Sequence, residues 1–198
     1  MERQRVAWTP SGRREAAVAV QPLRRGEGRE VRAPCTSVRI RLFGNTIPAV
    51  SSEPRHIASA FWDALYTRDW ERIRSFFGPD SIYYDVPTGP ATAARGPDGI
   101  EARLRLGLET LSGYEHISGN VVAEGEWVIT EHEETWRWAS GESVTLPFVS
   151  VQRVADGLIT LWKDYWDYQT LMNAAPADWQ ERLATADLSW IFDATGIA

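Results

Sequence analysis

The chain has 198 residues, of which 43% are hydrophobic and 24% are charged, and its formal net charge is −6. This length and composition are typical of a soluble globular protein with one core, and no apolar run approaches the roughly 18 to 20 residues of a membrane-spanning helix. Residues 1–50 hold 10 Arg and 4 Glu (+6), so the other 148 residues hold 11 basic and 23 acidic groups (−12). We therefore expect neither a membrane nor a nucleic acid as a partner.

Residues 1–50 show no sustained periodicity, and their arginines alternate with glycine, proline and small residues. They lack the continuous apolar segment of a signal peptide. We interpret them as a disordered, arginine-rich leader. The alternatives are a targeting or nucleic-acid-binding tail, and an upstream extension of a protein that begins near Val50. The only cysteine, Cys35, lies in this stretch, which excludes disulfides and cysteine metal sites. We expect a cytoplasmic location.

Helical spacing of apolar residues begins after residue 50 and predicts three helices. Asp69 is a suitable N-cap for the second helix, and Gly78-Pro79 ends it. In chain order we expect a helix from Ser51 to about Leu65, a helix from Asp69 to Phe77, a short strand from Ser81 to Val86, a loop from Pro87 to Pro97 and a helix from Asp98 to Leu111.

After Gly113 the pattern changes to strands separated by glycine-containing turns. The expected strands are Tyr114–Ala123, Trp127–Trp138, Ser143–Val154 and Leu158–Tyr168. Helices followed by consecutive hairpins predict an α+β fold, a curved antiparallel sheet forming a cone with three N-terminal helices over its concave face. We assign residues 51–175 to this domain and residues 176–198 to a C-terminal helical tail. The tail holds a helix near 178–184 and an apolar piece, 188–192, which closes a pocket or packs on a partner.

The strand Ser143–Val154 is apolar on both faces, with Leu146 and Phe148 on one and Val149 and Val151 on the other. If one face lines the interior, the outer face needs cover. We expect a homodimer through the outer sheet face. The alternative is cover by the C-terminal tail.

Asp164 lies in the last strand with Trp162 and Trp166 on the same face, because side chains alternate along a strand. A carboxylate on an apolar, inward face is costly to desolvate, so we expect its pKa to be raised. Such a group is a candidate general base. The alternative is that Asp164 lies at the strand end and reaches solvent or a backbone N–H group.

His132 and Glu134 alternate onto one face of the strand Trp127–Trp138, together with Trp136. If this strand and that of Asp164 share a sheet, His132 would lie between Glu134 and Asp164. An imidazolium donates from both ring nitrogens and would bridge the two carboxylates. The alternative is a solvated acidic stretch. The spacing His-x-Glu alone is too unspecific to indicate a metal site. We therefore expect no metal and no cofactor.

The order of elements resembles the limonene-1,2-epoxide hydrolase family of the nuclear-transport-factor-2-like superfamily, which also contains polyketide cyclases and ketosteroid isomerases. The resemblance rests on the Trp-Lys-Asp-Tyr-Trp-Asp run, the segment 130–134 and the Tyr-Tyr-Asp-Val-Pro run, and it covers roughly residues 55–176. It implies a deep, mostly apolar pocket in which an epoxide is opened in one step. The fold by itself hosts many functions.

The resemblance also implies roles for individual residues. Asp164 matches the base that deprotonates a water, Tyr83 matches a tyrosine that helps to hold this water, and Glu134 stands where the protonated acid is expected. Two positions differ from the family pattern: His132 replaces an arginine that bridges the two acids, and Asp85 replaces an asparagine. A histidine bridge is lost on deprotonation. An added aspartate raises the pKa of neighbouring acids.

Alternation and the resemblance together predict the walls of an apolar substrate pocket. The expected substrate-binding residues are Leu111, Trp136, Leu146, Phe148 and Trp166. We therefore expect a cofactor-free hydrolase that opens the epoxide of a hydrophobic small molecule of terpenoid, steroid or polyketide-like character. The alternatives are an isomerase or cyclase on a polyketide or steroid-like substrate, and a binding module without catalytic activity.

Overall fold

Helices and strands alternate in groups along residues 53–197, the part of the chain that the computed structural model describes. The expectation of a disordered leader over 1–50 lies outside these residues. The helices are α1 (Glu53–Thr67), α2 (Trp70–Ser75), α3 (Gly96–Leu108), α4 (Tyr168–Ala174) and α5 (Ala177–Ala184), with a 3₁₀ turn at Pro90–Thr92. The strands are β1 (Ile82–Asp85), β2 (Ala93–Arg95), β3 (Gly113–Glu124), β4 (Trp127–Arg137), β5 (Ser143–Ala155), β6 (Leu158–Tyr165) and β7 (Ile191–Phe192).

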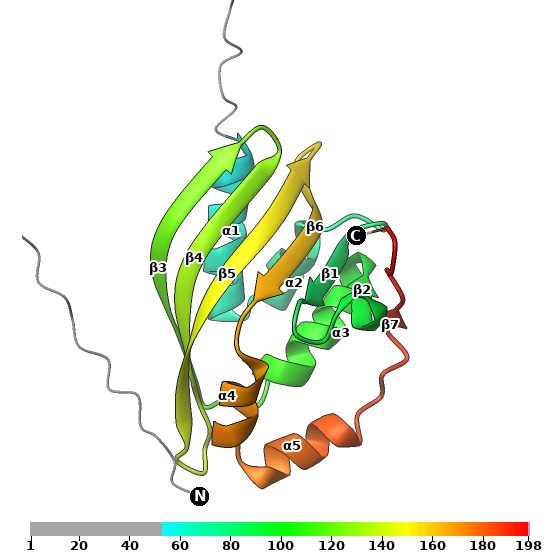
Figure 1. Ribbon diagram of the computed structural model, residues 1–198. Helices are drawn as coiled ribbons and strands as arrows, with labels where there is room; N and C mark the ends of the chain where they lie inside the picture. Colours follow the sequence, from blue (N-terminus) through cyan, green and yellow to red (C-terminus); the bar gives the residue numbers. More distant parts are fainter. Residues whose placement is uncertain (1–52, 198) are drawn as a thin grey trace, which may run out of the picture. The chain divides into compact units, whose positions relative to one another are not determined.

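The strands form one curved sheet that does not close, in the order β3-β4-β5-β6-β1-β2-β7 (Figure 1). Strands β3 to β6 pair antiparallel as consecutive hairpins, which confirms the predicted α+β class. The pair of β1 and β6 is parallel, so the sheet is antiparallel-rich rather than wholly antiparallel. The parallel register aligns Asp85 on β1 with Asp164 on β6.

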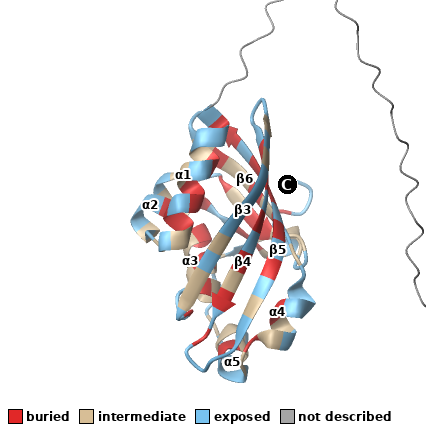
Figure 2. Ribbon diagram, turned by 90° about the vertical axis from the view of Figure 1, so that its left-hand side faces the viewer, coloured by how far each residue is buried: buried red, intermediate tan, exposed pale blue. Residues whose placement is uncertain are grey.

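The burial of β4 alternates along the strand, as the sequence pattern predicts (Figure 2). Its buried residues are Val128, Thr130, His132, Glu134 and Trp136. This set confirms the predicted inward face of β4, because the apolar residues Val128 and Trp136 are buried on the same face as His132 and Glu134. His132 and Glu134 therefore belong to the concave side of the sheet and not to a solvated strand.

Helix α1 covers this concave side and packs against β3, β4, β5 and β6 (Figure 1). Its buried side chains Phe61, Trp62 and Leu65 recur at helical spacing and enter the core. Helix α2 is capped by Asp69, whose carboxylate accepts from the Arg72 N–H at 3.1 Å, as predicted. Helix α3 packs on β1, β2 and α2.

The expectation of a loop over Pro87–Pro97 was wrong in part, because this stretch contains the 3₁₀ turn and β2. Strand β2 forms since its three residues find partners on both sides, on β1 and on β7. Strand β7 belongs to the apolar piece predicted over 188–192, which thus extends the sheet edge. The predicted helix near 178–184 is α5, and α4 precedes it.

The outer sheet face exposes large apolar side chains on four neighbouring strands, β3 to β6. These residues are Ile117, Val122, Trp127, Ile129, Val149 and Tyr165. In the described C-terminal residues, Trp179 of α5 packs instead against Trp136 and Trp138, and β7 pairs with β2. None of the helices within 53–197 has the length and apolar character needed to cross a bilayer.

Candidate active site

Asp164 is 4% exposed and lies near the end of β6. Its Oδ1 accepts two hydrogen bonds at 2.5 Å, from the Ser150 hydroxyl and from the Trp162 indole N–H. Its Oδ2 has no hydrogen-bond partner within the described residues. Burial raises the pKa of Asp164 well above its usual range, and the charge of Asp85 raises it further. The raised pKa and the inward position that the sequence predicts for Asp164 both agree with the structure.

Glu134 on β4 is 4% exposed and also holds two donors. Its Oε1 accepts from the Tyr114 hydroxyl at 2.8 Å, and its Oε2 accepts from the Trp136 indole N–H at 2.9 Å. Burial raises the pKa of Glu134 to about 7, although these hydrogen bonds oppose the shift and Asp85 adds to it. The charge of Glu134 also raises the pKa of Asp164, so the protonation states of the two acids depend on each other.

His132 does not form the predicted direct bridge between the two acids. Its Nε2 lies 2.9 Å from the Ser150 hydroxyl oxygen, and Ser150 in turn reaches Asp164. Its Nδ1 lies 3.8 Å from Glu134 Oε1, too far for a hydrogen bond. Burial, with the neighbouring His116, lowers the pKa of His132 to about 3, so the ring is neutral and cannot act as a charged bridge at neutral pH.

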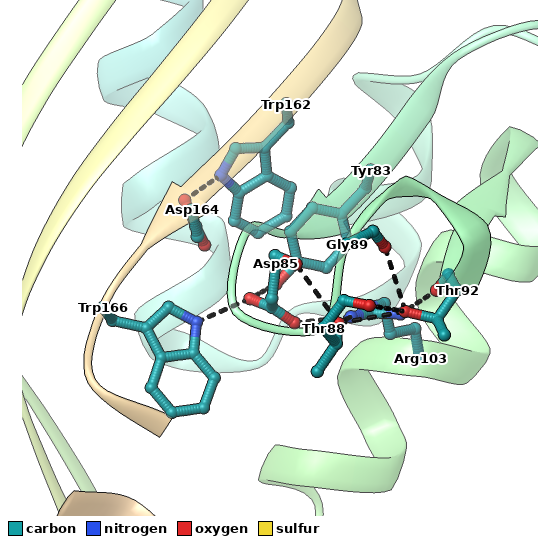
Figure 3. A network of polar contacts seen from close by, with 9 residues as sticks. All are labelled: Tyr83, Asp85, Thr88, Gly89, Thr92, Arg103, Trp162, Asp164 and Trp166. Carbon is teal, nitrogen blue, oxygen red and sulfur yellow. Dashed lines mark hydrogen bonds and ion pairs between the residues drawn. The ribbon is translucent and has the colours of Figure 1, made fainter. Parts of the chain in front are cut away.

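Asp85 is paired with an arginine that the sequence pattern did not indicate (Figure 3). Arg103 Nη2 of α3 donates to Asp85 Oδ2 at 2.6 Å, while Asp85 Oδ1 accepts from Trp166 Nε1 at 2.8 Å and from the Tyr83 hydroxyl at 3.1 Å. The Arg103 side chain is 10% exposed and that of Asp85 is 15% exposed. The guanidinium also donates to the Thr92 carbonyl. The aspartate thus has a cationic partner where the related family has a neutral amide.

We expect Arg103→Met to lower the free energy of unfolding by about 2 to 3 kcal/mol, since it leaves a largely buried carboxylate without its cation. The double variant with Asp85→Asn should recover most of this loss, because the unpaired charge is then removed. Urea unfolding of the single and double variants measures the difference. Arg105→Met is the control on the same helix, whose pairs with Glu101 and Glu109 are more exposed. Equal losses in the two single variants would contradict the pairing.

The two acids meet at an inner cavity of about 80 Å³ between α1, α3 and the sheet. It is lined by Leu65, Tyr83, Asp85, Arg103, Leu104, Gly107, Leu108, Tyr114, Glu134, Trp136, Phe148, Trp162, Asp164 and Trp166. Three predicted wall residues, Trp136, Phe148 and Trp166, are among them. Leu111 and Leu146 do not line the cavity; both are buried core residues, because their side chains pack between the sheet and helices.

An outer cavity of about 310 Å³ adjoins the inner one and shares five of its lining residues. The shared residues are Asp85, Arg103, Gly107, Trp136 and Trp166. The remaining wall is largely apolar and comes from Thr88 and Thr92, from α3 and from the segment 168–191, with Leu171, Trp179, Leu183, Leu188 and Trp190. Trp166 and Arg103 are therefore among the residues that border both cavities.

Sequence reasoning missed three functional candidates: Ser150, Tyr114 and Arg103. Ser150 had a signal, because alternation places it with Leu146 and Phe148 on the inward face of its strand. Tyr114 lies at the start of β3, where the neighbouring residues show no alternating pattern that would indicate its direction. Arg103 had no signal, since a helix face rich in arginine usually contacts solvent. Within residues 53–197 no group of three or more His, Cys, Asp or Glu is arranged to hold a metal ion.

A curved, open sheet with helices on its concave face is consistent with the class of nuclear-transport-factor-2-like domains. The chain belongs to the SnoaL-like domain family, whose model matches residues 58–162.

Solved structures agree with this assignment. An LEH-like epoxide hydrolase of M. tuberculosis is 27% identical, with a TM-score of 0.53 over 62% of this chain and 88% of that chain. A SnoaL-like polyketide cyclase (putative) of Jannaschia sp. CCS1 is 19% identical, with a TM-score of 0.58 over 68% of this chain and 99% of that chain. A similar protein of Shewanella putrefaciens CN-32 is 19% identical, with a TM-score of 0.56 over 62% and 95%. The two lower identities bear on the fold alone.

Proposed function

We propose that this protein is a cofactor-free hydrolase that opens the epoxide of a hydrophobic small molecule by attack of water. The observation that carries the proposal is the meeting of Asp164 and Glu134 at one enclosed, mostly apolar cavity, each held by its own pair of donors. Such a pair can hold one proton and act as base and acid at the same time. The similarity to the LEH-like epoxide hydrolase supports this reaction over the others of the family.

In the proposed reaction Asp164 is ionised and Glu134 is protonated. The free Oδ2 of Asp164 takes a proton from a water in the cavity as the water oxygen bonds to an epoxide carbon. The bond from that same carbon to the epoxide oxygen breaks as the water bonds, and Glu134 gives its proton to the epoxide oxygen, so the product is a diol. The Tyr83 hydroxyl donates to Asp85 and keeps a lone pair that can accept from the attacking water. Arg103 and Trp166 hold Asp85 in place.

The direct test is turnover of a panel of epoxides, including limonene oxide and a steroid epoxide, followed by mass spectrometry. A gain of one water in the product is the expected result. A product of unchanged mass from a cyclic ketone or polyketide would instead favour the isomerase or cyclase, for which the same Asp164 would be the base. Binding of apolar ligands without any conversion would favour the binding module.

We propose that the substrate is larger than the inner cavity and extends into the outer one. About 80 Å³ holds a few water molecules, whereas small-molecule sites usually measure about 300 Å³ or more. The outer cavity, at about 310 Å³ and with apolar walls, would receive the hydrophobic part of the substrate.

A larger side chain in the wall of the outer cavity should therefore impair turnover of a bulky substrate more than turnover of a small one. We expect Leu183→Trp to raise KM for a bulky epoxide about tenfold or more and to change KM for a small epoxide less than about twofold. Leu183→Met keeps the side-chain volume and serves as the control. Steady-state kinetics with the two substrates measures the effect. Equal changes for both substrates would show that the outer cavity does not receive the substrate.

We also propose a homodimer through the outer sheet face, supported by the exposed apolar residues on β3 to β6 and by the packing of α5 elsewhere. Ile129 lies on this face on β4, between β3 and β5, and Ile129→Lys should convert the dimer to a monomer because a charge would be buried in the interface. Light scattering after size exclusion gives the mass. Ile197→Lys, at an exposed apolar residue outside the sheet, is the control. A monomeric wild type would refute the proposal.

A further inference from the structure

Arg103 is the only basic side chain that borders either the inner or the outer cavity, counted over residues 53–197. It extends from α3 and lines both cavities, whereas most of the remaining outer wall is aromatic or aliphatic. In pockets of this kind a few polar groups fix the orientation of the ligand. The ion pair with Asp85 uses only part of the hydrogen-bonding capacity of Arg103.

A guanidinium carries five N–H donors in one plane. Nη2 of Arg103 donates to Asp85 Oδ2 at 2.6 Å and to Thr88 Oγ1 at 3.3 Å, and Nη1 donates to the Thr92 carbonyl (Figure 3). With Tyr83 counted as the acceptor of a fourth hydrogen bond, at least one N–H group remains for a ligand. A donor left unpaired beside apolar walls is unfavourable, so a ligand oxygen at this point would be stabilised.

Two aromatic rings hold the guanidinium in position. Its Cζ lies 5.2 Å from the centroid of the Tyr83 ring and 5.5 Å from that of Trp190, within the range of cation–π contacts. The Arg103 side chain is only 10% exposed. Because its position is fixed before a ligand arrives, binding to the remaining donor costs little conformational entropy.

The charges around Arg103 favour a neutral ligand over an anion. Asp85 neutralises the guanidinium, and Asp164, which lines the inner cavity, is ionised in the proposed reaction. An anionic group at the boundary of the cavities would therefore meet a net negative charge. A carbonyl or hydroxyl oxygen accepts a hydrogen bond from Arg103 without this repulsion.

We propose that Arg103 determines substrate specificity by donating a hydrogen bond to a neutral carbonyl or hydroxyl oxygen on the carbon skeleton of the substrate. The inference rests on the proposed function, in which the epoxide reacts in the inner cavity with Asp164 and Glu134. Since Arg103 borders that cavity, the recognised oxygen lies close to the epoxide and not at the far end of the substrate. The substrate class is thus an oxygenated hydrophobic epoxide, such as an epoxy ketone, and neither a hydrocarbon epoxide nor an epoxy acid.

Carvone oxide and limonene oxide are matched probes, because they share one carbon skeleton and differ by a ketone oxygen beside the epoxide. The measured quantity is the ratio of kcat/KM for carvone oxide to kcat/KM for limonene oxide. We expect this ratio to be about tenfold lower in the double variant Asp85→Asn/Arg103→Met than in Asp85→Asn. Neither protein holds an unpaired Asp85 carboxylate, and the asparagine oxygen can still accept from Arg103.

The ratio removes any change in rate that is common to both substrates, so a purely structural role of Arg103 would not move it. Arg105→Met, at a residue of the same helix that borders neither cavity, should keep the wild-type ratio. Equal ratios in Asp85→Asn and in the double variant would overturn the proposal.

A second measurement does not need turnover. Carvone and limonene, which carry no epoxide, should quench the fluorescence of the tryptophans in the outer wall as they bind. The ratio of the limonene Kd to the carvone Kd should be about tenfold lower in the double variant than in Asp85→Asn. Perillate, a carboxylate with the same carbon skeleton, should bind wild type more weakly than carvone does.

An unchanged Kd ratio, no binding of carvone, or tighter binding of perillate than of carvone would overturn the proposal. If no epoxide is converted, the proposed function fails, and the Kd ratios still decide whether Arg103 recognises a neutral oxygen.

Discussion

Asp164→Asn should abolish diol formation while the protein remains folded. The asparagine keeps the size of the side chain and an oxygen that accepts from Ser150 and Trp162, but it cannot take a proton from water. General acid or base groups contribute about a hundredfold to ten-thousandfold to a reaction, so we expect kcat/KM to fall by about a thousandfold. Mass spectrometry of the diol measures the rate, and circular dichroism checks the fold.

Asp167→Asn is the matched control for this substitution. Asp167 is three residues away and caps α4, accepting from the Gln169 N–H at 2.9 Å and the Thr170 N–H at 3.3 Å. Asparagine caps helices as well as aspartate does, so this variant should keep both stability and activity. Full activity in Asp164→Asn would exclude Asp164 as the base and would move the choice toward an isomerase with another base or toward simple binding.

Glu134→Gln should remove activity and stabilise the protein at alkaline pH. The folded-state pKa of Glu134 is raised to about 7 from 4.5, so the folded protein binds this proton more tightly than the unfolded chain does. The resulting destabilisation of the wild type is absent below about pH 4.5, grows up to about pH 7 and is complete above it, where it reaches about 3 kcal/mol. Glutamine carries no charge, so the variant does not suffer this destabilisation. The Tyr114 hydroxyl can rotate to accept a hydrogen bond from the glutamine amide.

Urea unfolding at about pH 4 and about pH 8.5 tests this expectation, since the linkage is fully developed only at the higher value. The variant should match the wild type at the lower pH and exceed it at the higher one. Glu133→Gln, on the exposed face of the same strand, should leave the pH dependence of stability unchanged. Parallel pH profiles of Glu134→Gln and wild type would mean that Glu134 is not a buried acid of raised pKa.

The sequence by itself determined the fold class and the direction in which key side chains point. Strand alternation has a period of two, which is a local property, so the neighbouring tryptophans indicated an inward face for Asp164, His132 and Glu134. The solvent-exposed alternatives for these residues were excluded by their burial in the structure. The raised pKa of Asp164 followed from the same local reasoning, because two flanking tryptophans imply burial. The order of helices and hairpins likewise needed only short-range signals.

The tertiary structure decided which of these inward groups meet and through which partners. The pairing of Asp85 with Arg103, the insertion of Ser150 between His132 and Asp164, and the parallel pairing of β1 with β6 depend on strand register and helix docking. The assignment of Leu111 and Leu146 to the core and not to the cavity wall has the same origin. Residues on one face share a direction, but contact across strands is set by distances of a few ångströms that only packing of the whole domain determines.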